Sequence, residues 1–366
     1  MAEFSAPESA LMARALQLAE RGLYTAHPNP MVGCVIVNNG KVVGEGWHEL
    51  AGEPHAEINA LQAAGNDAQG ATVVVTLEPC SHQGKTPPCT KALIEAGIGE
   101  VIVGLKDPNP VVSGKGFSEL EAAGIAVRKG LMRESVQTLL AGFITRCTRG
   151  RPFVRVKMAS SIDGCIAMSN GQSQWITGPE ARADVQRLRA RSGAIVSGIG
   201  TVLADDPAFT VRDPSVETRG KQPLRVVVDS ELRMPLSAEM LALPGETLIY
   251  CCDDDNRQAL DDAGAEIIKI DGEDGAVNLT QVLEDLARRE VNDVLVEAGP
   301  ILAGKMIEEN LVDELVIYQA PHIMGSQTMG MFQTPTWKNL TDRRALHITD
   351  LRKVGGDTRI TAQFAD

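Results

Sequence analysis

The sequence predicts an α/β protein of two three-layer domains, each with a sheet between helices, and three observations lead to this prediction. The chain has 366 residues, which corresponds to two or three domains of ordinary size. Strand-sized apolar runs alternate with segments of helical periodicity along most of its length. The polar segment Thr148–Pro152, which contains Gly and Pro, interrupts this alternation as a linker would. We therefore expect domains at residues 1–148 and 149–366.

The first domain is expected to contain a mixed sheet covered by helices. Leu11, Ala15 and Leu18 recur at helical spacing, which predicts an opening helix. The turn Asn38-Asn39-Gly40 predicts a hairpin between the first two strands. The expected helices are Pro7–Arg21, His55–Ala64, Cys89–Ala96, Gly116–Ala123 and Arg133–Cys147. The expected strands are Met31–Asn38, Lys41–Trp47, Ala71–Leu77, Glu100–Leu105 and Ile125–Arg128.

The second domain is expected to contain a mostly parallel sheet with antiparallel edges. Its last two strands have no helix between them, and Gly355-Gly356-Asp357 predicts a hairpin turn there. The expected helices are Pro179–Ala190, Asn256–Asp262, Leu279–Arg288 and Ile301–Glu309. The expected strands are Phe153–Ala159, Ala194–Ser197, Leu224–Val228, Thr247–Cys251, Glu266–Ile270, Asp293–Val296, Leu315–Gln319, Leu346–Val354 and Thr358–Phe364.

Composition excludes several classes of function. Lys and Arg number 35 against 48 Asp and Glu, and the resulting net charge of −13 disfavours a nucleic-acid-binding surface. Apolar runs stay well below the roughly 18 residues of a membrane span, and we identify no signal peptide near the N-terminus. The odd number of cysteines, seven, is typical of a reducing compartment. We expect a cytoplasmic protein that binds neither membranes nor nucleic acid.

Histidine and cysteine gather in the first domain in a pattern typical of a catalytic zinc site. His55 and Glu57 form a His-x-Glu string, and Pro79-Cys80 follows a buried strand, with Cys89 after eight further residues. Zinc deaminases have a His-x-Glu string followed by Pro-Cys-x-x-Cys, so the spacer is longer here. One imidazole and two thiolates leave one tetrahedral zinc position open for water.

The expected chemistry sets a geometric condition. Zinc lowers the pKa of a bound water to about 7, and Glu57 is the expected catalytic proton carrier. Residues i and i+2 do not share a face within a helix, so His55 must stand at the very start of its helix, as Pro54 suggests. A structural site with His82 as a fourth ligand is the alternative.

The first domain resembles the bifunctional riboflavin-biosynthesis deaminase/reductase family. The matching strings are His27–Gly33, Gly44–His48, His55–Glu57, Thr76–Cys80, Gly84–Cys89, Asp107–Pro110 and Gly114–Gly116. The resemblance implies a cytidine-deaminase-like fold. It also implies hydrolysis of the 2-amino group of 2,5-diamino-6-ribosylamino-4(3H)-pyrimidinone 5′-phosphate. The implied substrate contacts are Asn29, His48, His82, Lys85 and Thr86.

The second domain carries two glycine turns that favour a nucleotide crevice. Gly198-Ile199-Gly200-Thr201 and Glu297-Ala298-Gly299-Pro300 each follow an expected strand, although a complete G-x-G-x-x-G is absent from the sequence. Backbone N–H groups at a helix start bind anions, and the carboxyl ends of parallel strands meet at one edge of a sheet. Two ordinary strand-to-helix turns are the alternative. Arg189 and Arg212 are candidates for binding a substrate phosphate.

This domain is similar to the reductase half of the same family. The strings are Val156–Gly164, Gly171–Thr177, Leu188–Ala190, Gly198–Thr201, Ala204–Pro207, Val228–Ser230 and Val296–Gly299, with Ala298 where the family commonly has Gly. The resemblance implies a dihydrofolate-reductase-like fold, NADPH as cofactor and 5-amino-6-ribitylamino-uracil 5′-phosphate as product. It also implies a homo-oligomer, a dimer or tetramer.

The resemblance implies two sets of contacts in this domain, and the residues themselves add one hypothesis. The implied NADPH contacts are Ala159, Trp175, Thr201, Asp205, Ser230, Gly299, Pro300, Ile301, Leu302, Ala303, Gly304 and Lys305. The implied substrate contacts are Ser173, Arg189, Phe209, Arg212 and Glu297. Lys157 and Glu297 are the ionisable residues of two matching strings that could supply protons, whereas Asp163 is expected to structure the backbone. We hypothesise that Lys157 assists ring opening or protonates the ribityl oxygen.

Two other classes of function remain alternatives. A nucleic-acid base deaminase with an accessory nucleotide-binding domain is disfavoured by the net charge and by the insertion Gly84–Pro88. A non-catalytic protein that retains the fold is disfavoured by the intact set His55, Glu57, Cys80 and Cys89.

Overall fold

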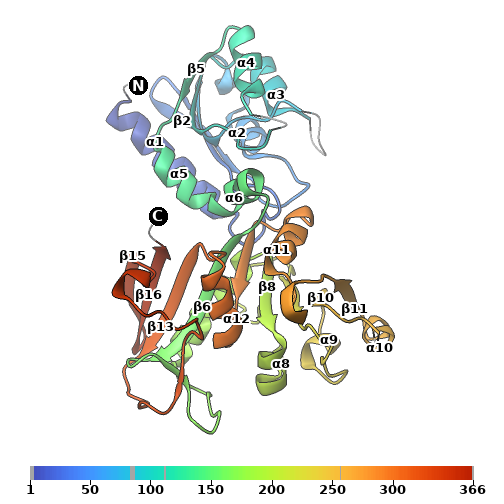
Figure 1. Ribbon diagram of the computed structural model, residues 1–366. Coiled ribbons are helices and arrows are strands. Elements are labelled where there is room, and N and C mark those ends of the chain that lie inside the picture. The colour runs from blue at the N-terminus through green and yellow to red at the C-terminus, as the bar shows by residue number, and fades with distance from the viewer. Residues whose placement is uncertain (1–3, 83–86, 111–112, 256, 365–366) are drawn as a thin grey trace. The chain divides into compact units, whose positions relative to one another are not determined.

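The computed structural model describes residues 4–82, 87–110, 113–255 and 257–364 (Figure 1). Contacts between Cα atoms divide the chain into two compact units, Met1–Gly150 and Arg151–Asp366. The division falls within the expected linker Thr148–Pro152. Each unit contains one large sheet with its own core.

The sheet of the first unit is mixed, in the order β2-β1-β3-β4-β5. β1 pairs antiparallel with both β2 and β3, whereas β3, β4 and β5 run parallel. The carboxyl ends of β3 and β4 therefore meet at one edge, where candidate site residues follow. The strands are β1 (Gly33–Asn38), β2 (Lys41–Trp47), β3 (Thr72–Leu77), β4 (Glu100–Leu105) and β5 (Ala126–Lys129).

Helices cover both faces of this sheet, as expected. Helices α2 (Ala56–Ala64), α3 (Cys89–Glu95) and α4 (Lys115–Ala122) pack on one face through Ala60, Leu93 and Leu120. Helices α1 (Ala6–Glu20), α5 (Arg133–Leu139) and α6 (Ala141–Arg149) contribute Met12, Val136 and Phe143 to the core on the other face. A short 3-10 turn, η1 (Gly65–Ala68), follows α2.

One expected helix is divided in the structure. Residues Arg133–Cys147 were expected to form one continuous helix, but α5 ends before Leu140 and α6 begins after it. Leu140 has φ −98° and ψ 16°, outside the helical range, and its side chain is buried in the core. Apolar periodicity continues through the break, so the pattern alone did not reveal it.

The sheet of the second unit is parallel except at one edge. Its order is β11-β10-β9-β8-β12-β6-β13-β16-β15, and only β16 and β15 run antiparallel to their neighbours. The expectation of antiparallel edges is thus correct for one edge, and the opposite edge is parallel. The strands are β6 (Phe153–Ser161), β8 (Ala194–Gly198), β9 (Leu224–Val228), β10 (Thr247–Cys251), β11 (Ala265–Lys269), β12 (Asp293–Val296), β13 (Glu314–Ala320), β15 (Leu346–Val354) and β16 (Asp357–Phe364).

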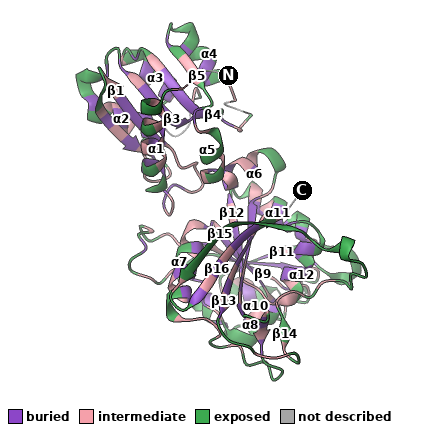
Figure 2. Ribbon diagram, turned by 90° about the vertical axis from the view of Figure 1, so that its left-hand side faces the viewer, coloured by how far each residue is buried: buried purple, intermediate pink, exposed green. Residues whose placement is uncertain are grey.

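Helices again cover both faces of the second sheet. One face packs against α11 (Leu279–Arg288) and α12 (Pro300–Glu308). The other packs against α7 (Pro179–Arg191), α8 (Ile199–Asp205), α9 (Glu239–Ala242) and α10 (Gln258–Asp262). Buried residues concentrate on the central strands, whereas the outer faces of the helices and β15 are exposed (Figure 2).

Several short elements were not expected from the sequence. Helices α8 and α9 each span fewer than eight residues, too short for a helical period to stand out. The others are strands β7 (Cys165–Ala167) and β14 (Met329–Gly330), which pair with each other, and the 3-10 turns η2 (Glu273–Gly275) and η3 (Leu340–Asp342). Within the described residues, no helix has both the length and the apolar character needed to cross a membrane.

Candidate functional site

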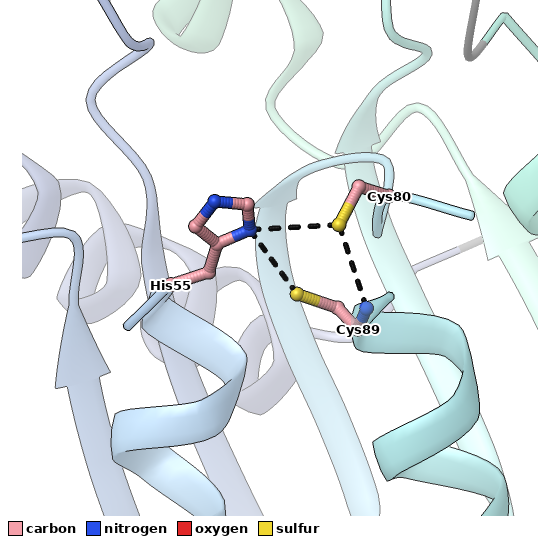
Figure 3. Close-up of side chains that lie close together, drawn as sticks. All are labelled: His55, Cys80 and Cys89. Carbon is pink, nitrogen blue, oxygen red and sulfur yellow. Dashed lines mark hydrogen bonds between the residues drawn. The ribbon is translucent and has the colours of Figure 1, made fainter. Parts of the chain in front are cut away.

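Three side chains converge in the first unit, one imidazole and two thiols (Figure 3). The Nδ1 atom of His55 lies 3.5 Å from Sγ of Cys80 and 3.3 Å from Sγ of Cys89. All three candidate ligand atoms lie within 4.8 Å of one another. In a tetrahedral zinc site with ordinary bond lengths, nitrogen and sulfur ligands are roughly 3.6 Å apart. The three atoms therefore fit Zn²⁺ without rearrangement.

Two helix starts and one strand end hold these side chains. His55 is the N-cap of α2, with φ −74° and ψ 165°, so its extended backbone turns the ring away from the helix. Cys89 is the first residue of α3, and Cys80 follows β3. The backbone N–H of Cys89 donates to Sγ of Cys80 at 3.4 Å. The geometric condition set by the sequence, with His55 at the helix start, is met.

The surroundings favour a thiolate at Cys80. Its hydrogen bond with the Cys89 thiol, together with the His55 ring and the Cys89 N–H, lowers the pKa of Cys80 to about 4. A thiolate is the form that binds zinc. His82, the fourth ligand of the structural alternative, is exposed and lies outside the group of three. With three protein ligands and one open position, the described residues fit a catalytic site better than a structural one.

Glu57 lies in the first turn of α2, beside the thiols. Its side chain is only 4% exposed. Burial, followed by the negative charge of Cys80, raises the pKa of Glu57 to about 7. A carboxyl group with a pKa near neutrality can both accept and release a proton at physiological pH.

Asn29 and His48 lie next to His55. The amide nitrogen of Asn29 is 3.0 Å from Nε2 of His48, and Nδ1 of His48 is 3.2 Å from the carbonyl oxygen of Pro54. Because a carbonyl only accepts, Nδ1 of His48 carries the proton in this arrangement. The His48 and His55 rings meet edge to face, with centroids 5.3 Å apart. Asn29 and His48 thus border the centre, whereas Lys85 and Thr86 lie outside the described residues.

The second unit brings Lys157, Arg189 and Glu297 to one face of its sheet. Arg189 of α7 donates from Nε and Nη2 to the two carboxylate oxygens of Glu297, at 2.6 and 3.0 Å. Its guanidinium also lies 5.7 Å from the ring centre of Phe209. Burial opposes ionisation of Glu297, but the charge and hydrogen bonds of Arg189 outweigh it, so the Glu297 pKa lies below its usual value. Burial lowers the pKa of Lys157, and the charge of Glu297 partly offsets this.

A buried network that the sequence did not reveal fixes the helix carrying Arg189. Asp184 of α7 accepts hydrogen bonds from the Tyr318 hydroxyl at 2.6 Å and from Nη1 of Arg359 at 2.9 Å. Tyr318 is fully buried on β13, and Arg359 pairs with it on β16. These bonds connect α7 to the sheet that carries Lys157. Their partners are far apart in sequence and form no motif, so no local signal could have identified them.

The two glycine turns lie side by side at the carboxyl ends of β8 and β12. The N–H of Gly299 donates to the Thr201 hydroxyl at 3.1 Å, and the Ser197 hydroxyl donates to the carbonyl of Glu297 at 2.7 Å. A Cβ atom added at Gly200 would have no atom from another part of the chain within 4 Å. The space beside Gly200 is therefore open, which is compatible with the expected approach of a ligand to this turn.

The remaining expected contacts of the second unit lie in varied surroundings. Trp175 is 70% exposed and stacks with Arg182, whose guanidinium is 4.6 Å from the ring centre. The Asp205 carboxylate accepts a hydrogen bond from the Gln174 side chain at 3.3 Å. The backbone N–H of Arg212 donates a hydrogen bond to the Gln186 side chain at 2.8 Å, and the Arg212 side chain is exposed. Ala159, Ser173 and Ser230 are half-buried.

Three residues of α12 that belong to the expected cofactor stretch pack against or pair with other protein groups. Ala303 is fully buried in the core, and a Cβ on Gly304 would collide with the backbone of Gln333. Lys305 forms ion pairs with Glu308 and Glu309 on its own helix. These contacts concern the side-chain positions of Ala303, Gly304 and Lys305, and the expectation that the stretch Gly299–Lys305 contacts a cofactor stays a prediction.

Comparisons with known proteins place both units in known families. Residues 5–105 match the cytidine and deoxycytidylate deaminase zinc-binding region, and residues 152–359 match the RibD C-terminal domain. The riboflavin biosynthesis protein RibD of Escherichia coli is 45% identical, with the match covering 94% of this chain and 96% of that protein.

Solved structures agree with these matches. RibD of Acinetobacter baumannii superposes with a TM-score of 0.93 at 40% identity, covering 98% of this chain and 99% of that one. A diaminohydroxyphosphoribosylaminopyrimidine deaminase/5-amino-6-(5-phosphoribosylamino)uracil reductase from Thermotoga maritima gives 0.86 at 32% identity, with the same coverage. The expected family and fold class are confirmed. The chain belongs to the RibD family of riboflavin biosynthesis proteins, bifunctional enzymes with a zinc-binding deaminase domain followed by a reductase domain.

Proposed function

We propose that this enzyme catalyses two consecutive steps on one phosphorylated pyrimidine. Residues 1–148 would hydrolyse the 2-amino group of 2,5-diamino-6-ribosylamino-4(3H)-pyrimidinone 5′-phosphate. Residues 149–366 would then reduce the ribosyl group with NADPH, giving 5-amino-6-ribitylamino-uracil 5′-phosphate. The resemblance of both halves to one family supports this pairing, and so does the −13 net charge, which disfavours a nucleic-acid substrate.

The deamination depends on the residues around His55. His55, Cys80 and Cys89 would hold Zn²⁺, which would supply the Lewis acidity that makes a water nucleophilic at neutral pH. Glu57 accepts the proton of that water and delivers it to the departing amino group. Its pKa of about 7 suits both transfers. Asn29 and His48 orient the pyrimidine ring from beside His55, and His82, Lys85 and Thr86 contact the ribosyl phosphate end.

The reduction depends on a separate set of charges. The first turn of α8 and the stretch Gly299–Lys305, together with Thr201 and Ser230, would hold NADPH, which would supply the hydride. Trp175, Ala159 and Asp205 complete the cofactor contacts. Arg189, Arg212, Ser173, Phe209 and Glu297 hold the substrate. Lys157 holds the proton that the sugar oxygen needs when the ring opens to the imine that accepts the hydride.

A single observation carries the proposal: a carboxyl group of raised pKa is buried beside three converging zinc-type ligands. The test is Glu57→Gln in the full chain, since Gln keeps the shape but cannot carry a proton. We expect retained zinc, loss of ammonia release by at least about 100-fold, and NADPH oxidation within twofold of wild type when deaminated substrate is supplied. Wild-type protein without zinc, or a variant that still deaminates, would refute the proposal.

Two further expectations stay predictions. A homo-oligomer, dimer or tetramer, follows from the resemblance, and sedimentation equilibrium of the full chain would test it. A cytoplasmic location also follows from cysteine usage, and cell fractionation would test that.

A further inference from the structure

Glu78 is a buried carboxylate that binds backbone rather than a cation. Its side chain is 3% exposed. Oε1 accepts hydrogen bonds from the N–H groups of Gly114 at 2.8 Å, Gly116 at 3.1 Å and Phe117 at 3.4 Å. Oε2 accepts from Asp107 at 3.1 Å and from Gly114 at 3.0 Å. Both oxygens are thus occupied by N–H donors.

These bonds hold the start of α4 against the end of β3. Gly114 is the N-cap of α4, where free N–H groups and the helix dipole favour a negative charge. Asp107 follows β4, so the same carboxylate also holds the loop that leaves the neighbouring strand. One side chain therefore joins three segments: the end of β3, the loop after β4 and the first turn of α4.

The joined segment leads directly to a candidate zinc ligand. Only Pro79 separates Glu78 from Cys80, and Pro79 is packed against α4. A Cβ on Gly116 would lie 2.2 Å from the Pro79 carbonyl oxygen, so the helix approaches Pro79 as closely as glycine permits. The backbone on the N-terminal side of Cys80 is therefore fixed by the Glu78 carboxylate and by contact with Gly116.

We propose that Glu78 is a positioning residue of the candidate zinc centre. Its carboxylate fixes the strand end from which Cys80 projects, so that Sγ of Cys80 stays within ligand distance of His55 and Cys89. This inference rests on the proposed zinc site. If Glu78 only caps α4, its loss lowers the stability of the domain but leaves the affinity for zinc unchanged.

Glu78→Gln is the sharpest variant, because the amide is isosteric but turns one acceptor oxygen into an N–H₂ group. Whichever oxygen is replaced, the new donor faces backbone donors. Glu8→Gln is the matched control. Glu8 also accepts hydrogen bonds at a helix start, from Ser5 N at 2.7 Å and Ser5 Oγ at 2.9 Å, and in addition pairs with Arg128, but it caps α1 on the other face of the sheet.

The measurement is the zinc dissociation constant of the full-length chain, obtained by competition with a chromogenic chelator, alongside the melting temperature of the metal-free protein. We expect Glu78→Gln to raise the constant about 10- to 100-fold, the usual effect of losing a residue that orients a ligand. Glu8→Gln should leave it within twofold. Equal zinc affinities in wild type and a folded Glu78→Gln would overturn the inference.

A second variant covers the case in which Glu78→Gln does not fold. Gly116→Ala keeps the carboxyl group and suits a helix, but its methyl group would lie 2.2 Å from the Pro79 carbonyl oxygen and 3.2 Å from Oε1 of Glu78, so both groups must shift. We expect the same loss of zinc affinity, and wild-type affinity would reject the positioning role. Wild-type protein that binds no zinc would instead reject the proposed function itself, so the two failures are distinguishable.

Discussion

The two domains contain buried carboxyl groups in opposite electrostatic surroundings. Glu57 has no cation bonded to it among the described contacts, and burial beside Cys80 raises its pKa to about 7. Glu297 forms two hydrogen bonds with Arg189, which hold its pKa below the usual value despite burial. The first group is suited to carry a proton, whereas the second is suited to remain a fixed negative charge. The opposite surroundings are consistent with our proposal that Lys157, rather than Glu297, carries the proton in the second domain.

The domains also differ in how their site residues are distributed along the chain. The candidate zinc ligands lie within residues 55–89, at two helix starts and one strand end. Lys157, Arg189 and Glu297 come from β6, α7 and the end of β12, and only the sheet topology brings them together. A metal centre requires particular residue types at close spacing, while a nucleotide crevice uses backbone N–H groups and common side chains.

The largest expected effect tests whether the two sites act independently. Cys89→Ala removes one of three zinc ligands, so we expect loss of zinc and a fall in deamination of about 1,000-fold or more. NADPH oxidation with deaminated substrate should stay within twofold of wild type. Metal analysis and the two separate assays on one preparation provide the measurement. A parallel fall in both activities would show that the two sites do not act independently.

The next effect tests the role assigned to Lys157. Lys157→Ala should lower kcat of the reduction about 100-fold, because no other amine would hold the proton at that position. The KM for NADPH should change little, and deamination should be unaffected. The assay follows the absorbance of NADPH over time. An unchanged kcat would remove Lys157 from the mechanism.

The sequence predicted the first site more completely than the second. His55, Glu57, Cys80 and Cys89 could be identified because their spacing is chemically informative, and the structure brings the three ligands together. Asp184 and Tyr318 could not be identified, because their hydrogen bond joins residues more than 130 positions apart. The expected cofactor contact of Ala303 came only from the resemblance, and its side chain is buried in the core, so this contact stays a prediction.

The break at Leu140 shows the same limit for the fold. Strands and long helices followed the hydrophobic period, and most of their bounds agree with the structure within two residues. A change in the backbone dihedral angles at Leu140 leaves the apolar pattern of that segment intact. Short helices such as α8 are too brief to produce a recognisable apolar period. Tertiary packing decides these details, and packing is not encoded in local periodicity.

A smaller effect tests the fixed charge of the second domain. Arg189→Lys keeps the positive charge but loses the two parallel bonds to Glu297. We expect the KM for the pyrimidine phosphate to rise about tenfold, with kcat within threefold of wild type. Initial rates over a range of substrate concentrations would measure both. A fall in kcat with constant KM would show that the pair acts on the chemical step instead.

The smallest effect concerns stability and tests the neutral state of Glu57 directly. In metal-free protein, a pKa raised from 4.5 to about 7 means that folding favours the protonated carboxyl group. The stability contributed by that proton is fully present below pH 4.5 and is lost as the pH rises through about 7. The shift corresponds to roughly 3 kcal/mol at most.

Glu57→Gln mimics the protonated group at every pH, so the difference between variant and wild type reports the Glu57 contribution together with its coupling to His55 and Cys80. Asp107, whose pKa burial raises to about 6, titrates in both proteins and cancels in the difference. We expect the metal-free variant to melt several degrees above wild type at pH 8, with the difference vanishing towards pH 4.5. Thermal unfolding in chelator across this range provides the test.

Because Glu297 has a lowered pKa, metal-free Glu297→Gln should show the opposite sign, melting below wild type at pH 8. If both variants moved in the same direction, the two carboxyl groups would not lie in opposite environments, and the division of roles between them would fail.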